Sequence, residues 1–353
     1  MSVGTRRQAT SYRGMLGLWF LLLVVVAHAT VVAEEEPPRY ALVVGVPRCP
    51  FLKDVGLAAR PLPYAIADAR AMAEALIKYR GFRKQNVKLL LDEQATHSAI
   101  RDSIMSWLGD KTRATPEALV VIFFAGHGTM GADKLDPNGL TDEEDGYDEY
   151  LLPYDAGRVP ARRSFWDSLV CDDEFAFWLG HLDSRKIVVV LDSCHSGDMA
   201  RAIVRGILPL DAGRAILVTD GFTRDLVLRS NRQTDGTAGL IILSACKADE
   251  DSHEDPALGH GVFTYYIVEA LTTLATSISV ERLFSYAKTS ILGHEPRWPQ
   301  TPTMDGSYSG EVYLPYEVLP ELSPVRDAEN DRSKDEPDQR QRREPGPPPI
   351  GFP

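Results

Sequence analysis

The chain has 353 residues, of which 44% are hydrophobic and 25% charged, and its formal net charge is −12. This composition is that of a globular protein and excludes a wholly disordered or collagen-like chain. The excess of acidic residues argues against nucleic-acid binding, which needs clustered Lys and Arg. Four cysteines are too few for a disulfide scaffold, although they could pair in an oxidising compartment. The sequence does not indicate which of them would pair.

The N-terminal segment has the pattern of an export signal. Arg6, Arg7 and Arg13 precede an apolar run over residues 15–27, and the first acidic residue is Glu34. A signal-peptide core has roughly 7–15 apolar residues, whereas a membrane-spanning helix needs about 20. We interpret residues 1–33 as a signal peptide and expect an exported protein, periplasmic or secreted. The alternative is an uncleaved N-terminal membrane anchor, and we expect no other contact with a membrane.

The opposite end is rich in proline and charge. Residues 323–353 contain almost no apolar side chains, so they cannot bury enough surface to offset the entropy lost on ordering. We interpret this segment as a disordered tail. Residues 40–317 are then left as one domain.

Short apolar runs alternate with helical patterns in this domain. Continuous runs rich in Val, Ile and Leu, which predict strands covered on both faces, occupy residues 40–46, 87–91, 118–125, 186–192 and 239–245. Apolar residues with helical spacing occupy residues 64–79, 96–108, 172–182 and 262–274. The alternation predicts an α/β domain on a mostly parallel sheet, in which a ligand site lies beyond the carboxyl ends of the strands.

One of these strand ends carries a histidine between two glycines. Residues 126–131 match the pattern G-x-G-x-x-G of dinucleotide-binding folds, and they follow a predicted strand. That fold needs a helix next, whose N-terminus receives the phosphates. Here a loop dense in acidic residues follows, up to Glu149, so we reject a nucleotide cofactor. The glycines instead leave His127 on a backbone that can approach a ligand closely.

Another strand end carries a thiol. Cys194 follows the run 186–192 directly and is well placed for nucleophilic attack, provided that a base removes its proton. His195 is adjacent, but neighbouring side chains on extended backbone point to opposite faces. His127, at the end of a different strand, is the better partner. A zinc enzyme is not indicated, because neither C-x-x-C nor H-E-x-x-H occurs.

The segments FFAGHG (residues 123–128) and DSCHSG (residues 192–197) resemble those of caspase-like cysteine proteases. The resemblance is closest to metacaspases and their bacterial relatives, the orthocaspases, and extends over residues 40–314. It implies a caspase-hemoglobinase-like fold, a three-layer α/β/α arrangement with a mostly parallel central sheet. It also implies a cysteine endopeptidase, in which Cys194 attacks the scissile carbonyl and His127 acts as acid and base. The backbone amides of Gly128 and Cys194 would hold the oxyanion.

The resemblance also implies a substrate preference. Metacaspases cut after arginine or lysine with an acidic pocket, and two pocket carboxylates of the family match Asp68 and Asp192. The family often has a serine two residues before the catalytic histidine, where this chain has Ala125. The expected substrates are therefore proteins or peptides with basic residues. Metacaspases also tend to be monomers, and we expect the same here.

Calcium is a further implication of the resemblance. No cofactor is needed for the chemistry, but some metacaspases are activated by calcium through acidic residues that match Asp148, Asp172 and Asp173. Carboxylate oxygens suit this cation. A fourth family ligand falls on Arg201, which cannot coordinate a cation. The alternative for the acidic segment is a solvated surface loop.

Two other functions remain open at this point. The chain could be a catalytically silent binding module on the same fold, or another thiol hydrolase such as an amidase.

The connection from residue 198 to residue 237 is long and contains several arginines, of which Arg229 and Arg232 are the predicted sites of self-cleavage.

Overall fold

The computed structural model describes residues 36–132, 147–159, 164–193, 239–247, 250–294, 299–308 and 311–318. The predicted signal peptide, the predicted tail, Cys194 and the connection with the predicted self-cleavage sites lie outside these ranges. None of the described helices is both long and apolar enough to cross a membrane.

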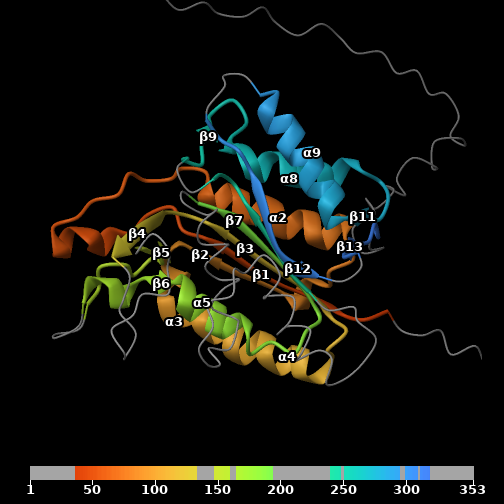
Figure 1. Ribbon diagram of the computed structural model, residues 1–353, viewed down its shortest axis with the longest axis horizontal. Coiled ribbons are helices and arrows are strands. Elements are labelled where there is room, and N and C mark those ends of the chain that lie inside the picture. Colours follow the sequence, from red (N-terminus) through yellow and green to blue (C-terminus); the bar gives the residue numbers. More distant parts are fainter. Residues whose placement is uncertain are drawn as a thin grey trace, which may run out of the picture. The chain divides into compact units, whose positions relative to one another are not determined.

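The main sheet of the described chain has six strands in the order β12-β8-β7-β3-β1-β2 (Figure 1). The strands are β1 (Arg39–Gly45), β2 (Val87–Leu91), β3 (Leu119–Ala125), β7 (Lys186–Asp192), β8 (Gly239–Ser244) and β12 (Thr303–Tyr308). All neighbours pair in parallel except β12 and β8, which are antiparallel. The five predicted strands are therefore confirmed to within one residue at each end.

Helices cover both faces of this sheet (Figure 1). One face is covered by α2 (Ala65–Tyr79), α8 (Val262–Thr273) and α9 (Val280–Leu292). The other face is covered by α3 (His97–Asp102), a π-helical turn η4 (Ser103–Leu108), α4 (Gly109–Ala114) and α5 (Asp172–Leu179). The three layers confirm the predicted α/β/α fold class.

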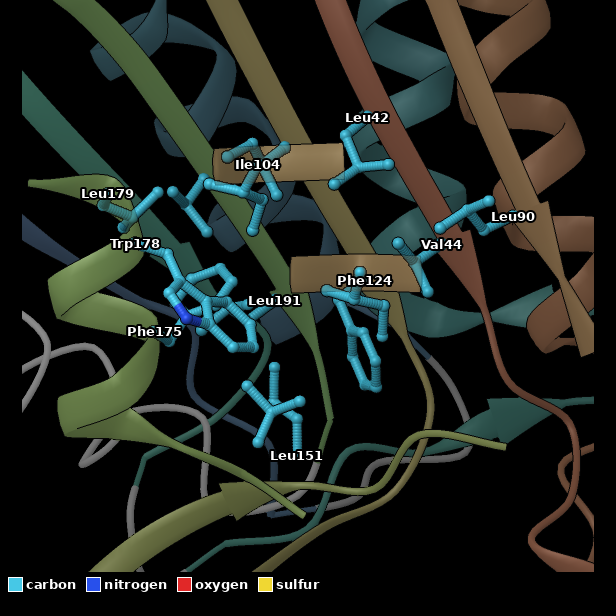
Figure 2. Packing of buried hydrophobic residues seen from close by; sticks show 14 of the residues in the cluster. Leu42, Val44, Leu90, Ile104, Phe124, Leu151, Phe175, Trp178, Leu179 and Leu191 are labelled. Atoms are coloured by element: carbon cyan, nitrogen blue, oxygen red, sulfur yellow. The ribbon is translucent and has the colours of Figure 1, made fainter. Parts of the chain in front are cut away.

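Each inner strand contributes side chains to two cores, which explains the continuous apolar runs in the sequence. In β1, Leu42 and Val44 face one core, whereas Ala41 and Val43 face the other. Figure 2 shows the first of these cores, where side chains of β1, β3 and β7 meet Trp178 of α5. Burial on both faces removes the alternation that a half-exposed strand would show.

Shorter elements surround the main sheet. A three-stranded antiparallel sheet is formed by β4 (Gly128–Ala132), β5 (Tyr147–Leu151) and β6 (Val170–Cys171). Two antiparallel pairs are formed by β9 (Glu254–Asp255) with β10 (His260–Gly261) and by β11 (Ile278–Ser279) with β13 (Tyr313–Leu314). Short 3₁₀ helices are η1 (Pro50–Val55), η2 (Lys84–Asn86), η3 (Asp92–Gln94) and η5 (Phe165–Ser168).

Two sequence predictions need correction here. Asp148 and Glu149, expected in an acidic loop, lie in strand β5, where Glu149 and Tyr150 are buried. The acidic residues of β5 gave no strand pattern in the sequence. This short strand pairs with β4, which begins directly after His127. The predicted helix over residues 96–108 continues through η4 and α4 to Ala114.

Arg80 ties the end of α2 to the end of α8. Its side chain is fully buried, and its guanidinium donates hydrogen bonds to five backbone carbonyls, those of Ala270, Leu271, Leu274, Thr276 and Pro315. All five carbonyls belong to the last turn of α8 or follow it, where the regular helical pairing ends. Those of Ala270 and Leu274 also accept from the amides of Leu274 and Thr276. A cation at a helix C-terminus also complements the helix dipole.

We predict that Arg80→Ala lowers the free energy of unfolding by about 3 kcal/mol, because buried carbonyls lose their donors. The exposed Arg101, which pairs with Asp102, is the matched control, and Arg101→Ala should change stability by less than about 0.5 kcal/mol. Urea denaturation of both variants measures the difference. Equal effects would contradict the role assigned to Arg80.

Candidate active site

The two predicted catalytic segments begin side by side at the carboxyl edge of the sheet. Strands β3 and β7 are parallel neighbours, and Ala125 at the end of β3 lies opposite Asp192 at the end of β7. The Gly126 amide donates to the Asp192 carbonyl at 3.2 Å, one residue before His127. Cys194 itself lies outside the described residues, two positions after the end of β7. The register thus brings the start of the cysteine segment against the start of the histidine segment.

The ring of His127 is held by a backbone carbonyl. Its Nε2 lies 2.6 Å from the Arg60 carbonyl oxygen. A carbonyl can only accept, so Nε2 must carry a proton, and Nδ1 is then the acceptor of the neutral ring. Burial lowers the pKa of His127; the hydrogen bond to Arg60 opposes this shift, and the charge of Arg60 reinforces it. The ring is therefore neutral at pH 7 and has a lone pair available as a base.

The strand that follows His127 leaves the Gly128 amide unused by its neighbour. The Leu152 amide donates to the His127 carbonyl at 3.0 Å, and Gly128 lies opposite Leu151. This register makes Gly128 and Leu151 a non-hydrogen-bonded pair of the antiparallel ladder, in which the N–H groups point away from the partner strand. The amide predicted to hold an oxyanion is therefore not consumed by the pairing of β4 with β5.

The three described cysteines have the environments of structural thiols. Cys49, Cys171 and Cys246 are buried, and none of them forms a disulfide. Burial raises the pKa of Cys49 to about 12. The Cys171 thiol donates to Asp172, and the Cys246 thiol donates to the carbonyls of Glu250 and Ser193. A protonated, buried thiol is not a nucleophile.

Asp68 lies in the first turn of α2, against the ends of the strands. Gly45, the last residue of β1, permits this approach: a Cβ atom there would lie 2.7 Å from the Ala65 carbonyl oxygen. The Asp68 side chain is only 3% exposed. Its Oδ1 lies 2.7 Å from His260 Nδ1, and the Gly261 amide donates to both carboxylate oxygens.

Asp192 is buried in the same place. Ser252 Oγ donates to its Oδ1 at 2.5 Å, and the amide and hydroxyl of Thr264 both donate to its Oδ2. The two aspartates converge on Gly261. A Cβ atom at this glycine would lie 2.7 Å from Asp192 Oδ2 and 3.1 Å from Asp68 Oδ2. Only a residue without a side chain fits between the two carboxylates.

A third carboxylate accompanies them. Glu254 of β9 accepts a hydrogen bond from the Tyr64 amide at 3.1 Å, and its charge interacts with those of Asp192 and Arg60. We refer to Asp68, Asp192 and Glu254 as the carboxylate cluster. Glu254 is half-buried, whereas both aspartates are nearly inaccessible.

The pKa values of all three carboxyl groups in the carboxylate cluster are raised. Burial raises the pKa of Asp68 to about 7; the hydrogen bond from His260 opposes this shift, and the charge of Asp192 adds to it. Burial also raises the pKa of Asp192, against the hydrogen bonds from Ser252 and Thr264. Burial raises the pKa of Glu254 as well. Buried like charges of this kind are stabilised by a proton or by a cation.

Comparison with known proteins identifies the family. The family model described as "Caspase domain" matches residues 38–313. The chain belongs to the caspase domain family. It is 28% identical over 218 residues to Metacaspase-3 of Arabidopsis thaliana, covering 59% of this chain and 54% of the relative. It is 32% identical over 141 residues to Metacaspase-1B of Aspergillus niger, covering 37% and 28% respectively. The chain thus spans about half or less of the length of these relatives.

The predicted resemblance to metacaspases is therefore confirmed at the level of the family, a family of cysteine peptidases that act on proteins. Metacaspase-6 of Arabidopsis thaliana is a further relative, 26% identical over 140 residues, covering 38% of this chain and 33% of the relative.

The residues predicted for calcium are only partly described in this caspase domain. Asp172 is buried at the start of α5, and the pairing of Tyr150 with Cys171 brings the position of Asp148 in β5 toward it. The side chains of Asp148 and Asp173, and all of Arg201, lie outside the described residues. Among the side chains that are described, no group of three or more His, Cys, Asp or Glu is arranged to hold a metal ion.

Sequence reasoning missed several residues of this caspase-domain site. The Arg60 carbonyl could not be predicted, because any residue offers the same backbone group. His260, Ser252, Thr264 and Glu254 lie far along the chain from the aspartates that they surround. His260 and Thr264 stand in the segment GHGVFTYYIVEAL (residues 259–271), which lies within the range that resembles the family, so part of this signal was present.

Proposed function

We propose that this caspase domain is a cysteine endopeptidase in which Cys194 and His127 are the catalytic pair. The observation that carries the proposal is the hydrogen bond from His127 Nε2 to the Arg60 carbonyl, made at the end of the strand next to the one that precedes Cys194. This hydrogen bond occupies Nε2 and leaves the basic Nδ1 of His127 free to accept the proton of the proposed nucleophile, Cys194. The buried thiols of the other cysteines support Cys194 as the nucleophile.

The proposed reaction has two stages. His127 Nδ1 takes the Cys194 proton, and the thiolate attacks the scissile carbonyl carbon to form a tetrahedral oxyanion near the amides of Gly128 and Cys194. The oxyanion collapses, the C–N bond breaks, and His127 gives its proton to the leaving amine. Water, deprotonated by His127, then attacks the thioester carbon. The C–S bond breaks, the acid product leaves, and His127 returns the proton to the Cys194 thiolate.

We propose further that the residue before the cut is arginine or lysine. The carboxylate cluster lies at the edge of the sheet where β3 ends before His127 and β7 ends before Cys194. Its aspartates are buried beside each other, so an incoming guanidinium would relieve their mutual repulsion and pair with both. An aspartate side chain would add a further negative charge. The absence of the family's pocket serine at Ala125 leaves this recognition to the carboxylates.

For the catalytic pair, we predict that Cys194→Ala and His127→Ala each lower kcat/KM by at least about 10³-fold, because each removes a group that acts in the transition state. His195→Ala is the matched control and should keep activity within about tenfold of the wild type. Hydrolysis of fluorogenic peptides measures all three. Full activity of the Cys194→Ala protein would refute the mechanism; inactivity of the wild type on every peptide would favour a silent module or another thiol hydrolase.

For the substrate preference, we predict that the wild-type protein cleaves peptides with Arg or Lys before the reporter at least about 100-fold faster than peptides with Asp or Gln. An unpaired buried charge costs about 3–5 kcal/mol, which sets the size of this discrimination. A matched set of four fluorogenic peptides gives the four values of kcat/KM. Faster cleavage after Asp would refute the preference.

We propose that calcium activates the enzyme by binding to Asp148, Asp172 and Asp173. Multiple carboxylates suit calcium, and the pairing of β5 with β6 supports the proximity of two of the three positions. We predict that millimolar calcium raises the cleavage rate and binds detectably by calorimetry, and that Asp172→Asn abolishes both effects. Magnesium serves as the control ion. If calcium neither binds nor changes the rate, the calcium proposal is wrong.

A further inference from the structure

His260 contacts the buried Asp68 carboxylate and is itself partly exposed to solvent. Its Nδ1 contacts Asp68 Oδ1 at 2.7 Å, and its side chain is 26% exposed whereas that of Asp68 is 3% exposed. Among the described residues, His260 is the basic side chain that contacts an aspartate of the cluster directly. It stands in β10, one residue before the glycine that separates the two carboxylates.

The charged groups around this pair are mostly negative. Asp192 reaches it from β7, and Asp255 lies opposite His260 in the hairpin of β9 and β10. Glu254, on the same hairpin, interacts with Asp192 and with Arg60, which precedes α2. The Tyr265 ring of α8 lies with its centroid 6.3 Å from that of His260. Asp68 therefore sits among carboxylates, with His260 as its nearest basic contact.

This arrangement makes the charge of Asp68 depend on His260. Burial and the neighbouring carboxylate favour a protonated, neutral Asp68. A hydrogen bond donated by His260 to the carboxylate favours the ionised form instead. A neutral carboxyl cannot form the paired, charge-assisted hydrogen bonds that a guanidinium requires. The same contact also fixes the plane of the carboxylate, because the imidazole holds Oδ1 while Gly261 lies against Oδ2.

We propose that His260 is a positioning residue that keeps Asp68 ionised and oriented to receive the basic side chain of the substrate. This inference rests on the proposed function, since it concerns the same recognition of arginine or lysine. His260 does not touch the reacting bond. Its effect is on how tightly the substrate binds and on the pH range in which it binds.

A purely structural role of His260 has to be separated from this one. The hairpin of β9 and β10 has a second anchor, because His294 Nε2 pairs with Asp255 at 3.0 Å and His294 Nδ1 contacts the Tyr266 hydroxyl. Both histidines thus fasten the same hairpin, His260 through Asp68 and His294 through Asp255. His294→Gln is therefore the matched control for loss of hairpin stability.

The experiment measures kcat and KM for an arginine peptide between pH 5.5 and 9. In the wild type, KM should rise as the pH falls below about 7, because Asp68 becomes protonated. His260→Leu should raise KM at pH 7 by at least tenfold with kcat within threefold, and should shift the acid limb of kcat/KM to higher pH. His260→Gln keeps a donor and should recover most of the loss. His294→Gln should retain the wild-type profile.

Three results would overturn the proposal. They are an unchanged pH profile in His260→Leu, a loss confined to kcat, and the same change in His294→Gln. If His260→Leu does not fold, ¹⁵N NMR of the wild-type His260 ring decides: a proton on Nδ1 above pH 7 is required, and its absence refutes the proposal.

Failure of the proposed function would be recognised separately. A wild-type protein without preference for arginine refutes that function by itself. The Asp68 carboxyl, followed by ¹³C NMR, then tests His260 alone: it should titrate at higher pH in His260→Leu than in His260→Gln, and equal midpoints would overturn the inference.

Discussion

The site depends on the burial of two like-charged carboxylates against one glycine. Asp68 and Asp192 come from different layers of the fold, yet both approach the position where Gly261 would carry a side chain. Such a pair is unfavourable unless every oxygen is hydrogen-bonded and a positive charge is near. Ser252, Thr264, His260 and the Gly261 amide supply the hydrogen bonds. Under the proposed function, the positive charge comes from the arginine or lysine side chain of the substrate.

The topology of the sheet makes this convergence possible. Because β1, β3 and β7 are parallel neighbours, the chain leaves all three strands at the same edge. One exit leads toward Asp68, one to His127 and one to Cys194. The segment before α2 then links the two functions, since the Arg60 carbonyl holds the histidine and the Tyr64 amide holds Glu254. The residues proposed for catalysis and for recognition therefore depend on the same short stretch of backbone.

Much of this was predictable from the sequence, for a physical reason. Strands buried on both faces leave continuous apolar runs, and residues directly after such runs meet at one edge, so the sequence pattern alone placed His127 and Cys194 at that edge. The assignment of Asp68 and Asp192 to the substrate pocket came from the family resemblance. Backbone groups such as the Arg60 carbonyl, and partners such as His260 that depend on a two-residue hairpin, leave no local pattern. The antiparallel β12 and helix α9 were also missed, although the spacing of Leu283, Phe284, Ala287 and Ile291 indicates a helix.

The central claim is that the charge of the carboxylate cluster selects the substrate. The most direct measurement is the ratio of kcat/KM for a peptide with arginine to that for the same peptide with citrulline, which has the shape of arginine without its charge. The account predicts a large ratio in the wild type that collapses toward one in Asp68→Asn and in Asp192→Asn, while the exposed Asp183→Asn leaves it unchanged. A ratio near one in the wild type, or a ratio that survives both substitutions, would contradict it.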